Sequence, residues 1–294
     1  MARIGDFLTL TKPGITLFIV MVAVAGFFTV SPYPPNLRSL AILAVVGALG
    51  SAGSAALNHF FDRDIDRKMH RTSDRPIPMD NLMPAQALLF GVGLIALSLI
   101  GAFFLLNTVV MLAIASGVAV YVGLYTLWLK RKTPWGTVLG GYAGSAAVLG
   151  GGAAVAGTLP LPVILLAVIV FLWTPPHFWS LAIALSSDFG RADLPALPDR
   201  RGLKDSARTV AVSAALLLPP TVAFALLGAT YFPFLLIGTV AGVGFFLATA
   251  RTMADASRRV AMRAFIASGI YLMAISGAMV VNWLVVSFHG LTWV

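Results

Sequence analysis

The sequence predicts an all-α, polytopic membrane protein with nine transmembrane helices and a cytoplasmic N-terminus. The first observation is composition: 59% of the 294 residues are hydrophobic and only 11% are charged, with a mean hydropathy of +0.92. Soluble domains carry about 25% charged residues, whereas a helix of about 20 apolar residues spans a bilayer. The other two observations are the number of such apolar runs and a one-sided distribution of charge.

The apolar runs begin at Gly14, after a short polar segment that has no features of a cleavable signal. An Arg-rich, Ser-rich transit peptide is also not recognised, which favours a bacterial or archaeal inner membrane. In chain order, we expect spans at residues 14–31, 38–60, 84–106, 108–128, 134–157, 160–184, 209–228, 231–250 and 265–288. Together they form one membrane-embedded unit over residues 1–294.

The connections between these runs are of two kinds. Four are charged: 61–83, 129–133, 185–208 and 251–264. Four are short and nearly free of charge: 31–37, 107, 158–160 and 228–232. If the N-terminus is cytoplasmic, all but Arg38 of the 20 Lys and Arg residues lie on the cytoplasmic side, as such residues usually do.

The 11 acidic residues are all aspartates, and they fall on that same side. Acidic residues contribute little to topology, so this concentration suggests that the cytoplasmic face binds a ligand. The net charge of +9 is then explained by topology and an anion site, and nucleic acid is not an expected partner. Cysteine is absent, which excludes disulfides and thiolate chemistry.

Asn58, Asp62 and Asp66 stand four residues apart where the second run enters its charged loop. On a helix, four residues advance about 6 Å and drift about 40°, so these side chains would share one face, with Asp64 off it. Their oxygens suit Mg²⁺, which usually binds one or two carboxylates and substrate phosphates. The neighbouring cations are Arg63, Arg67, Lys68, Arg71 and Arg75. This pattern predicts a metal and diphosphate site, although a solvated, salt-bridged loop is the simpler alternative.

Lys130 and Arg131 follow the fourth run, after Tyr125. They suit either the charged flank that ends a spanning helix or a clamp on phosphate oxygens, because Arg offers a bidentate fork and Lys a point charge.

The sixth run contains Trp173-Thr174-Pro175-Pro176-His177. The two prolines predict a break or kink, and a break inside a membrane is tolerated where it lines a cavity or is buried in protein. His177 is then either a site residue or a structural histidine bonded to a freed carbonyl. The same two interpretations apply to His59, and Trp173 suits either an interfacial belt or a cavity wall.

Asp188 follows the sixth run as Asp62 follows the second, which makes it a candidate fourth metal ligand. We interpret the two Asp loops, 58–83 and 185–208, as a weak internal duplication. Such repeats often place a site between two halves, and this leaves an anion transporter as an alternative to an enzyme.

These residues resemble the UbiA superfamily of intramembrane prenyltransferases over nearly the whole chain. The resemblance is carried by Asn58, Asp62 and Asp66, continued by Arg71-Thr72 to Arg75-Pro76, and by the segments around Tyr125, Gly140–Gly144 and Trp173–Trp179. The last three stretches most resemble the branch that farnesylates heme. Where that family often has an Asp pair followed by Tyr, this chain has Ser187-Asp188-Phe189, so Asp188 alone must supply the carboxylate.

The resemblance implies transfer of farnesyl from farnesyl diphosphate to a vinyl group of heme B, giving heme O and diphosphate. It implies Mg²⁺ held by Asn58, Asp62, Asp66 and Asp188, with Asp62, Asp66 and Lys130 as catalytic residues. Substrates would be bound by Arg67, Lys68, Arg71, Arg75, Arg131, Tyr125, His59, His177 and Trp173. Association with heme A synthase or terminal oxidase assembly is a further implication. Within the superfamily, prenylation of an aromatic acid or a quinone precursor is the second hypothesis.

Overall fold

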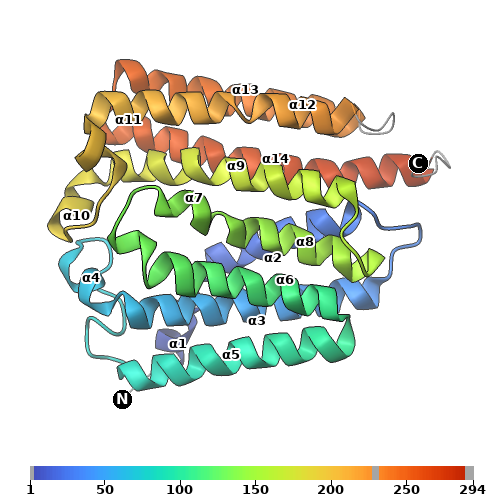
Figure 1. Ribbon diagram of the computed structural model, residues 1–294, viewed down its shortest axis with the longest axis horizontal. Helices are drawn as coiled ribbons and strands as arrows, with labels where there is room; N and C mark the ends of the chain where they lie inside the picture. The colour runs from blue at the N-terminus through green and yellow to red at the C-terminus, as the bar shows by residue number, and fades with distance from the viewer. Residues whose placement is uncertain (1–2, 227–231, 289–294) are drawn as a thin grey trace.

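The computed structural model describes residues 3–226 and 232–288, and every regular element within those ranges is helical (Figure 1). The first half contains α1 (Ile4–Leu10), α2 (Pro13–Phe28), α3 (Leu37–Phe61), α4 (Arg63–Lys68), α5 (Pro84–Leu105), α6 (Thr108–Val118), the π-helix η1 (Ala119–Thr126) and the 3₁₀ helix η2 (Leu129–Arg131). The second half contains α7 (Gly136–Gly140), α8 (Tyr142–Ala156), α9 (Leu161–Ala184), α10 (Ser186–Arg191), α11 (Leu197–Ala215), α12 (Leu218–Leu226), α13 (Phe232–Ala254) and α14 (Arg258–Phe288).

The predicted nine spans are confirmed when α1 and α2 are counted as one. Eight helical segments in the described ranges are long and apolar enough to cross a membrane, and α1 with α2 makes a ninth across a bend of 48°. The bend falls at Lys12, whose φ of 45° is left-handed, followed by Pro13, which begins α2. Because a residue before proline is disfavoured in the α region, the chain cannot pass straight from α1 into α2.

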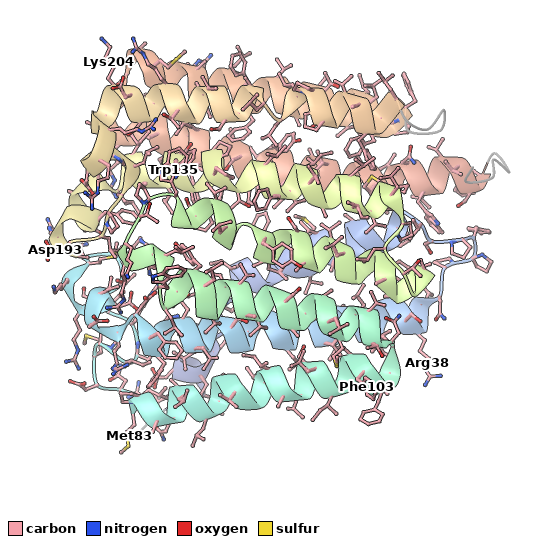
Figure 2. All side chains as sticks on the ribbon, viewed as in Figure 1. Arg38, Met83, Phe103, Trp135, Asp193 and Lys204 are labelled. Atoms are coloured by element: carbon pink, nitrogen blue, oxygen red, sulfur yellow. The ribbon has the colours of Figure 1, made fainter. Side chains whose placement is uncertain are left out.

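Charged groups gather at one end of the bundle, which we call the charged end. Figure 1 places α4 and α10 there, and Figure 2 shows Asp193, Lys204 and Trp135 at that end while Arg38 lies at the opposite one. The one-sided charge of the sequence is therefore a one-sided charge of the folded molecule.

The seventh span differs from the expected 209–228. Helix α11 begins at Leu197, and Gly202 interrupts it with a non-helical φ of 74°. The segment before the membrane run is thus helical rather than a loop, because its apolar positions, such as Leu197 and Pro198, are buried against the bundle while its charged positions are exposed.

Of the break or kink expected at Pro175 and Pro176, the break does not occur: α9 runs as one helix from Leu161 to Ala184. Two prolines remove two backbone donors, but α9 packs against α8, α11 and α14. The carbonyls that lose an amide donor are those of Phe171 and Leu172, and the hydroxyl bonds from Thr174 to the Val170 carbonyl (3.1 Å) and from Ser180 to the Pro176 carbonyl (2.7 Å) do not reach them. Packing against the surrounding helices is what makes proline tolerable here.

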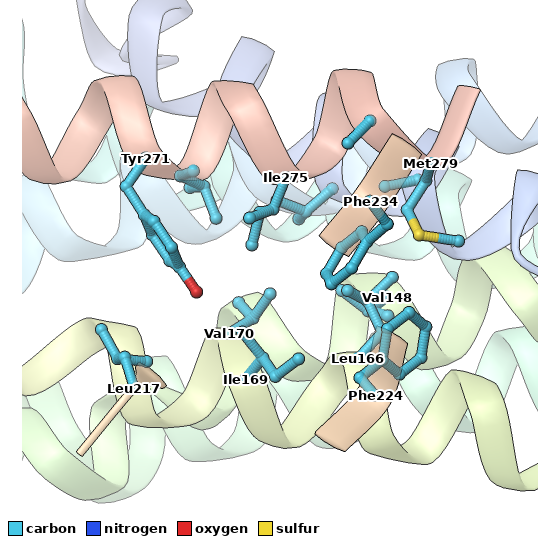
Figure 3. Close-up of a cluster of buried hydrophobic side chains, with 14 of the residues drawn as sticks. Val148, Leu166, Ile169, Val170, Leu217, Phe224, Phe234, Tyr271, Ile275 and Met279 are labelled. Atoms are coloured by element: carbon cyan, nitrogen blue, oxygen red, sulfur yellow. The ribbon is translucent and has the colours of Figure 1, made fainter. Parts of the chain in front are cut away.

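The core is formed mainly by α9 and α14, with contributions from α2, α8 and α11–α13. Figure 3 shows Tyr271, Ile275 and Met279 of α14 facing apolar side chains of neighbouring helices. Lipid tails are as apolar as these side chains, so the association rests on close packing. Helices α2 and α8 approach each other closely, because a Cβ on Gly151 would overlap the Ala23 carbonyl.

Candidate active site

Asn58, Asp62 and Asp66 share one buried face, as their spacing predicts. Helix α3 ends at Phe61, yet the hydrogen-bond pattern continues: the Asp62 amide donates to the Asn58 carbonyl (2.9 Å), and the Asp66 amide to the Asp62 carbonyl (2.8 Å). The three residues are 4%, 0% and 2% exposed. Asp64 lies off this face, and its side chain is 59% exposed.

Cations from three distant segments converge on this face. Lys130 Nζ lies 2.5 Å from Asp62 Oδ2, which also accepts a bond from Asn58 Nδ2 (2.6 Å). The Arg75 guanidinium donates to both oxygens of Asp66 (2.9 and 2.8 Å). Lys12 Nζ donates to Asn58 Oδ1 (2.6 Å). Two buried carboxylates are thus matched by cations, as buried charges must be.

Sequence reasoning missed Lys12. It stands beside the first apolar run, where it looks like an ordinary topology charge, and only the bend between α1 and α2 turns it toward Asn58. One sequence feature distinguishes it: Lys12 directly precedes Pro13, which predicts a fixed backbone at that position.

Helix η1 brings two tyrosines to the same place. A π-helix is rare and often found at functional sites. Here Thr126 Oγ1 donates to the Tyr121 carbonyl (2.8 Å) and accepts from Asn58 Nδ2 (3.2 Å), so η1 is tied to the acidic face. The rings of Tyr121 and Tyr125 lie 6.0 Å apart, between centroids.

Asp188 is held by the loop that follows α4. Its carboxylate accepts the backbone amides of His70 (3.3 Å) and Arg71 (3.1 Å), and Arg191 lies 3.7 Å away. Burial, followed by the neighbouring charge of Arg75, lowers the pKa of Arg71. Asp188 is buried and belongs to the same end of the bundle, so it connects α10 to the loop that carries Arg71 and Arg75.

Three of the predicted substrate-binding cations instead pair at the surface. Arg67 contacts Asp80 (2.7 Å), Lys68 lies 3.7 Å from Asp193, and Arg131 contacts Asp64 (2.8 Å). The hydrogen bond from Arg131 lowers the pKa of the Asp64 carboxyl. Their helix positions explain this: Arg67 and Lys68 follow Asp66 directly, so they point away from the face that Asp66 occupies.

Two cavities open beside the acidic face. The first, of about 200 Å³, is lined by polar groups that include Lys12, Asn58, Asp66, Arg71, Arg75, Tyr121, Tyr125 and Lys130. The second, of about 120 Å³, lies among small and apolar side chains of α2, α3, α6 and α8, including Ile19, Leu43, Gly47, Ala55, Ile114, Ala147 and Gly150. Lys12, Ile15 and Tyr121 line both cavities, so the polar and apolar chambers meet there.

His59, His177 and Trp173 line neither cavity. His177 Nδ1 lies 2.5 Å from Ser268 Oγ of α14, and its ring is stacked between Trp173 and Phe265. The wall that α9 presents to the first cavity consists of Phe178, Trp179, Leu181 and Ala182. Trp173 and His177 are one turn apart on α9, so they share the face of this helix that is turned toward α14 and away from the cavity. A role for these three residues in substrate binding stays a prediction.

His59 is 1% exposed, and neither ring nitrogen has a hydrogen-bond partner within the described part of the chain. It follows Asn58 directly and points into the bundle.

This arrangement suits an amphiphilic diphosphate. Lysine and arginine groups around buried oxygens can hold phosphate oxygens, and an apolar chamber joined to that place can hold a hydrocarbon chain.

Comparison with known proteins agrees with this chemistry. Residues 19–277 match the UbiA prenyltransferase family. The chain is 38% identical to protoheme IX farnesyltransferase 2 of Mesorhizobium japonicum over 94% of this chain and 89% of that protein. It is also 38% identical to the protoheme IX farnesyltransferase of Symbiobacterium thermophilum, over 74% of this chain and 72% of that one.

A solved structure has the same fold. The UbiA homolog from Archaeoglobus fulgidus, bound to DMAPP and Mg²⁺, matches with a TM-score of 0.73 at 17% identity, covering 94% of this chain and 99% of that one.

Proposed function

This chain belongs to the UbiA prenyltransferase family, and we propose that it transfers the farnesyl group of farnesyl diphosphate to a vinyl group of heme B, giving heme O and diphosphate. The observation that carries the proposal is its similarity, over nearly the whole chain, to proteins named protoheme IX farnesyltransferase. The geometry supports it, because a buried oxygen cluster, four cations and an apolar chamber meet at one place.

The diphosphate would lie between Lys12, Arg71, Arg75 and Lys130, which all line the first cavity. Such preorganised donors stabilise charge that develops on a leaving group. Lys12, Arg75 and Lys130 now contact Asn58, Asp66 and Asp62, respectively, so an incoming diphosphate would replace or share those contacts.

The oxygen cluster fits Mg²⁺. No group of three His or Asp side chains in residues 3–226 and 232–288 is close enough to hold a metal on its own. This agrees with an ion that takes only one or two carboxylates and completes its shell with phosphate and water. Asp62 Oδ1 is buried without a hydrogen-bond partner within those residues, and it is a hard oxygen donor that a bound cation would satisfy.

The predicted ligands Asn58, Asp62, Asp66 and Asp188 would share the binding of the metal, each ion taking one or two of the carboxylates together with phosphate oxygens and water. When bound, Mg²⁺ would supply Lewis-acid stabilisation of the departing diphosphate.

The farnesyl chain would enter the second cavity. Its walls are mostly glycines and Ala, Ile, Leu and Val side chains, with Ser51 and Ser54 as the neutral polar residues and Lys12 and Tyr121 on the side of the first cavity, so most of the hydrocarbon would meet apolar surface. Tyr121 stands where the two cavities meet, so its ring would face the first carbon of the chain.

In the transfer, the bond between that carbon and the diphosphate oxygen breaks, and the electron pair leaves with the diphosphate. A vinyl carbon of heme B bonds to the farnesyl carbon. Water then adds to the cation left beside the macrocycle and releases a proton, which leaves a hydroxyl group. The aromatic faces of Tyr121 and Tyr125 would stabilise the allylic cation, while the apolar walls keep bulk water from it.

The charged end would face the cytoplasm of a bacterial or archaeal cell. Support comes from the sequence, in which all but Arg38 of the Lys and Arg residues fall in segments expected on one side, and from Figure 2, where Lys204 and Arg38 lie at opposite ends; such residues mark the cytoplasmic side. Diphosphate and its metal would then be exchanged with the cytoplasm. Association with heme A synthase or terminal oxidase assembly would pass on the product. We also propose that the two Asp loops, 58–83 and 185–208, arose by an internal duplication.

Mass spectrometry of hemes tests the function. Membranes that contain this chain, supplied with heme B, farnesyl diphosphate and Mg²⁺, should accumulate heme O. A prenylated product on 4-hydroxybenzoate with no heme O would contradict heme as the acceptor. Counter-flow of intact substrate without diphosphate release would instead indicate a transporter.

A further inference from the structure

A second basic group lies beyond the cavity wall, at the start of α11. Leu194–Leu197 line the first cavity. Arg200 and Arg201, one turn later, and Arg208, further along α11, line a separate open hollow on the surface. We call these three residues the α11 arginine surface. Arg208 contacts Asp205 (3.4 Å), whereas Arg200 and Arg201 have no ion-pair partner within 4.0 Å in the described ranges.

Within this surface, Arg200 and Arg201 differ from the cations near α4. Arg67, Arg75, Lys130 and Arg131 each contact an aspartate. Arg200 and Arg201 are exposed and unmatched, so they can take an external anion without first losing an internal partner.

Aromatic side chains join the α11 arginine surface to the cavity. The Arg201 guanidinium lies 5.3 Å over the Trp135 ring, and Trp135 meets Trp179 edge to face with 5.3 Å between centroids. Trp179 lines the first cavity, and its Nε1 donates to the Pro134 carbonyl (3.3 Å). Two aromatic rings in contact therefore link the reaction cavity to unmatched guanidinium groups.

Resting on the proposed function, we propose that Arg200 and Arg201 bind the two propionate carboxylates of the porphyrin acceptor. The vinyl and propionate groups of heme B lie on opposite edges of the macrocycle. A vinyl group that reaches the diphosphate cavity therefore places the carboxylates away from it. Ionised groups are costly in the bilayer interior, which requires the propionate edge to stay at the charged end, where α11 begins.

Arginine is the suitable residue for this task, because its fork matches a carboxylate with two parallel hydrogen bonds. Trp135 and Trp179 supply the apolar surface along which the macrocycle would lie. The α11 arginine surface thereby selects an acceptor that carries carboxylates at the edge opposite its reacting vinyl group.

Heme titration tests this assignment in the full chain reconstituted in neutral-lipid nanodiscs. The double variant Arg200→Gln, Arg201→Gln should bind heme B about tenfold more weakly, with an unchanged KM for farnesyl diphosphate. Heme B dimethyl ester should bind wild type and this variant equally. Arg258→Gln, Arg259→Gln is the matched control, since it removes two exposed charges from the same end and should leave heme affinity unchanged.

Each contrary result overturns the assignment. Equal binding of heme B and its dimethyl ester by wild type would show that carboxylates are not recognised. Unchanged heme affinity in the α11 variant would show that Arg200 and Arg201 do not bind the propionates. These readouts concern binding, so they stay separate from heme O formation by wild type, which tests the proposed function.

Discussion

Asp62 has two carboxylate oxygens in different situations. Oδ2 contacts Asn58 and Lys130, whereas Oδ1 is buried without a partner within the described residues. A buried acceptor without a partner costs free energy, and a bound cation would remove that cost. Asp62 is therefore the residue at which metal binding and leaving-group stabilisation should depend most on one side chain.

Replacing Asp62 with Ala should lower the rate of Mg²⁺-dependent diphosphate release by about 100-fold or more, as expected for loss of preorganised electrostatic stabilisation. Asp64→Ala is the control, because this exposed carboxylate pairs with Arg131 off the buried face. The turnover of Asp64→Ala should stay within about twofold of wild type, because an exposed ion pair contributes little free energy. Unchanged turnover in Asp62→Ala would count against the metal assignment.

Lys12 is the residue whose importance the fold revealed. We expect Lys12→Met to raise the KM for farnesyl diphosphate about tenfold, because one charge-assisted contact to the diphosphate is lost. Lys132→Met serves as the control, since that exposed side chain lies over Trp128 outside both cavities. Equal KM values for wild type and Lys12→Met would remove Lys12 from the diphosphate site.

At the scale of elements, α9 shows how one helix serves two purposes. Its Trp173 and His177 face packs on α14, and its Phe178 and Trp179 face forms a cavity wall. Helices α2 and α8 set the shape of the apolar chamber on the other side, and they approach closely because Gly151 has no side chain.

Gly151→Val should therefore separate α2 from α8 and destabilise the protein by about 1–3 kcal/mol, the usual cost of overpacking. Thermal unfolding in detergent, followed by size-exclusion chromatography, would measure the loss. Gly93→Val on α5 is the control, because it makes the same substitution at a glycine with open space around it. Its midpoint of thermal unfolding should equal that of wild type. A Gly151→Val protein as stable as wild type would show that the contact is not required.

At the scale of the whole molecule, the two ends of the bundle differ in charge, and this difference sets orientation. The chain contains no cysteine, so single cysteines report orientation directly. In intact cells, a membrane-impermeant maleimide should label Arg38→Cys, whereas Lys204→Cys should be labelled only after permeabilisation. The cysteine-free parent should stay unlabelled, and the reverse pattern would contradict a cytoplasmic active site.

Several site features followed from local sequence alone. The four-residue spacing of Asn58, Asp62 and Asp66 placed them on one face, because helix geometry depends only on neighbouring residues. Lys130, Arg71 and Arg75 were also predicted and line the cavity. Arg67, Lys68 and Arg131 belong to the same charged segments, yet they pair at the surface, since a run of cations does not reveal which side chains turn inward.

The sequence by itself determined the nine spans, their charged end and the oxygen face. The length of an apolar run, the positions of charged residues and the helical period all depend on consecutive residues only. Only the tertiary structure decided that Lys12 meets Asn58, that His177 turns toward Ser268, and that α9 continues through two prolines. These outcomes depend on packing between segments far apart in the chain, and packing against neighbours can outweigh a local preference such as proline's tendency to break a helix.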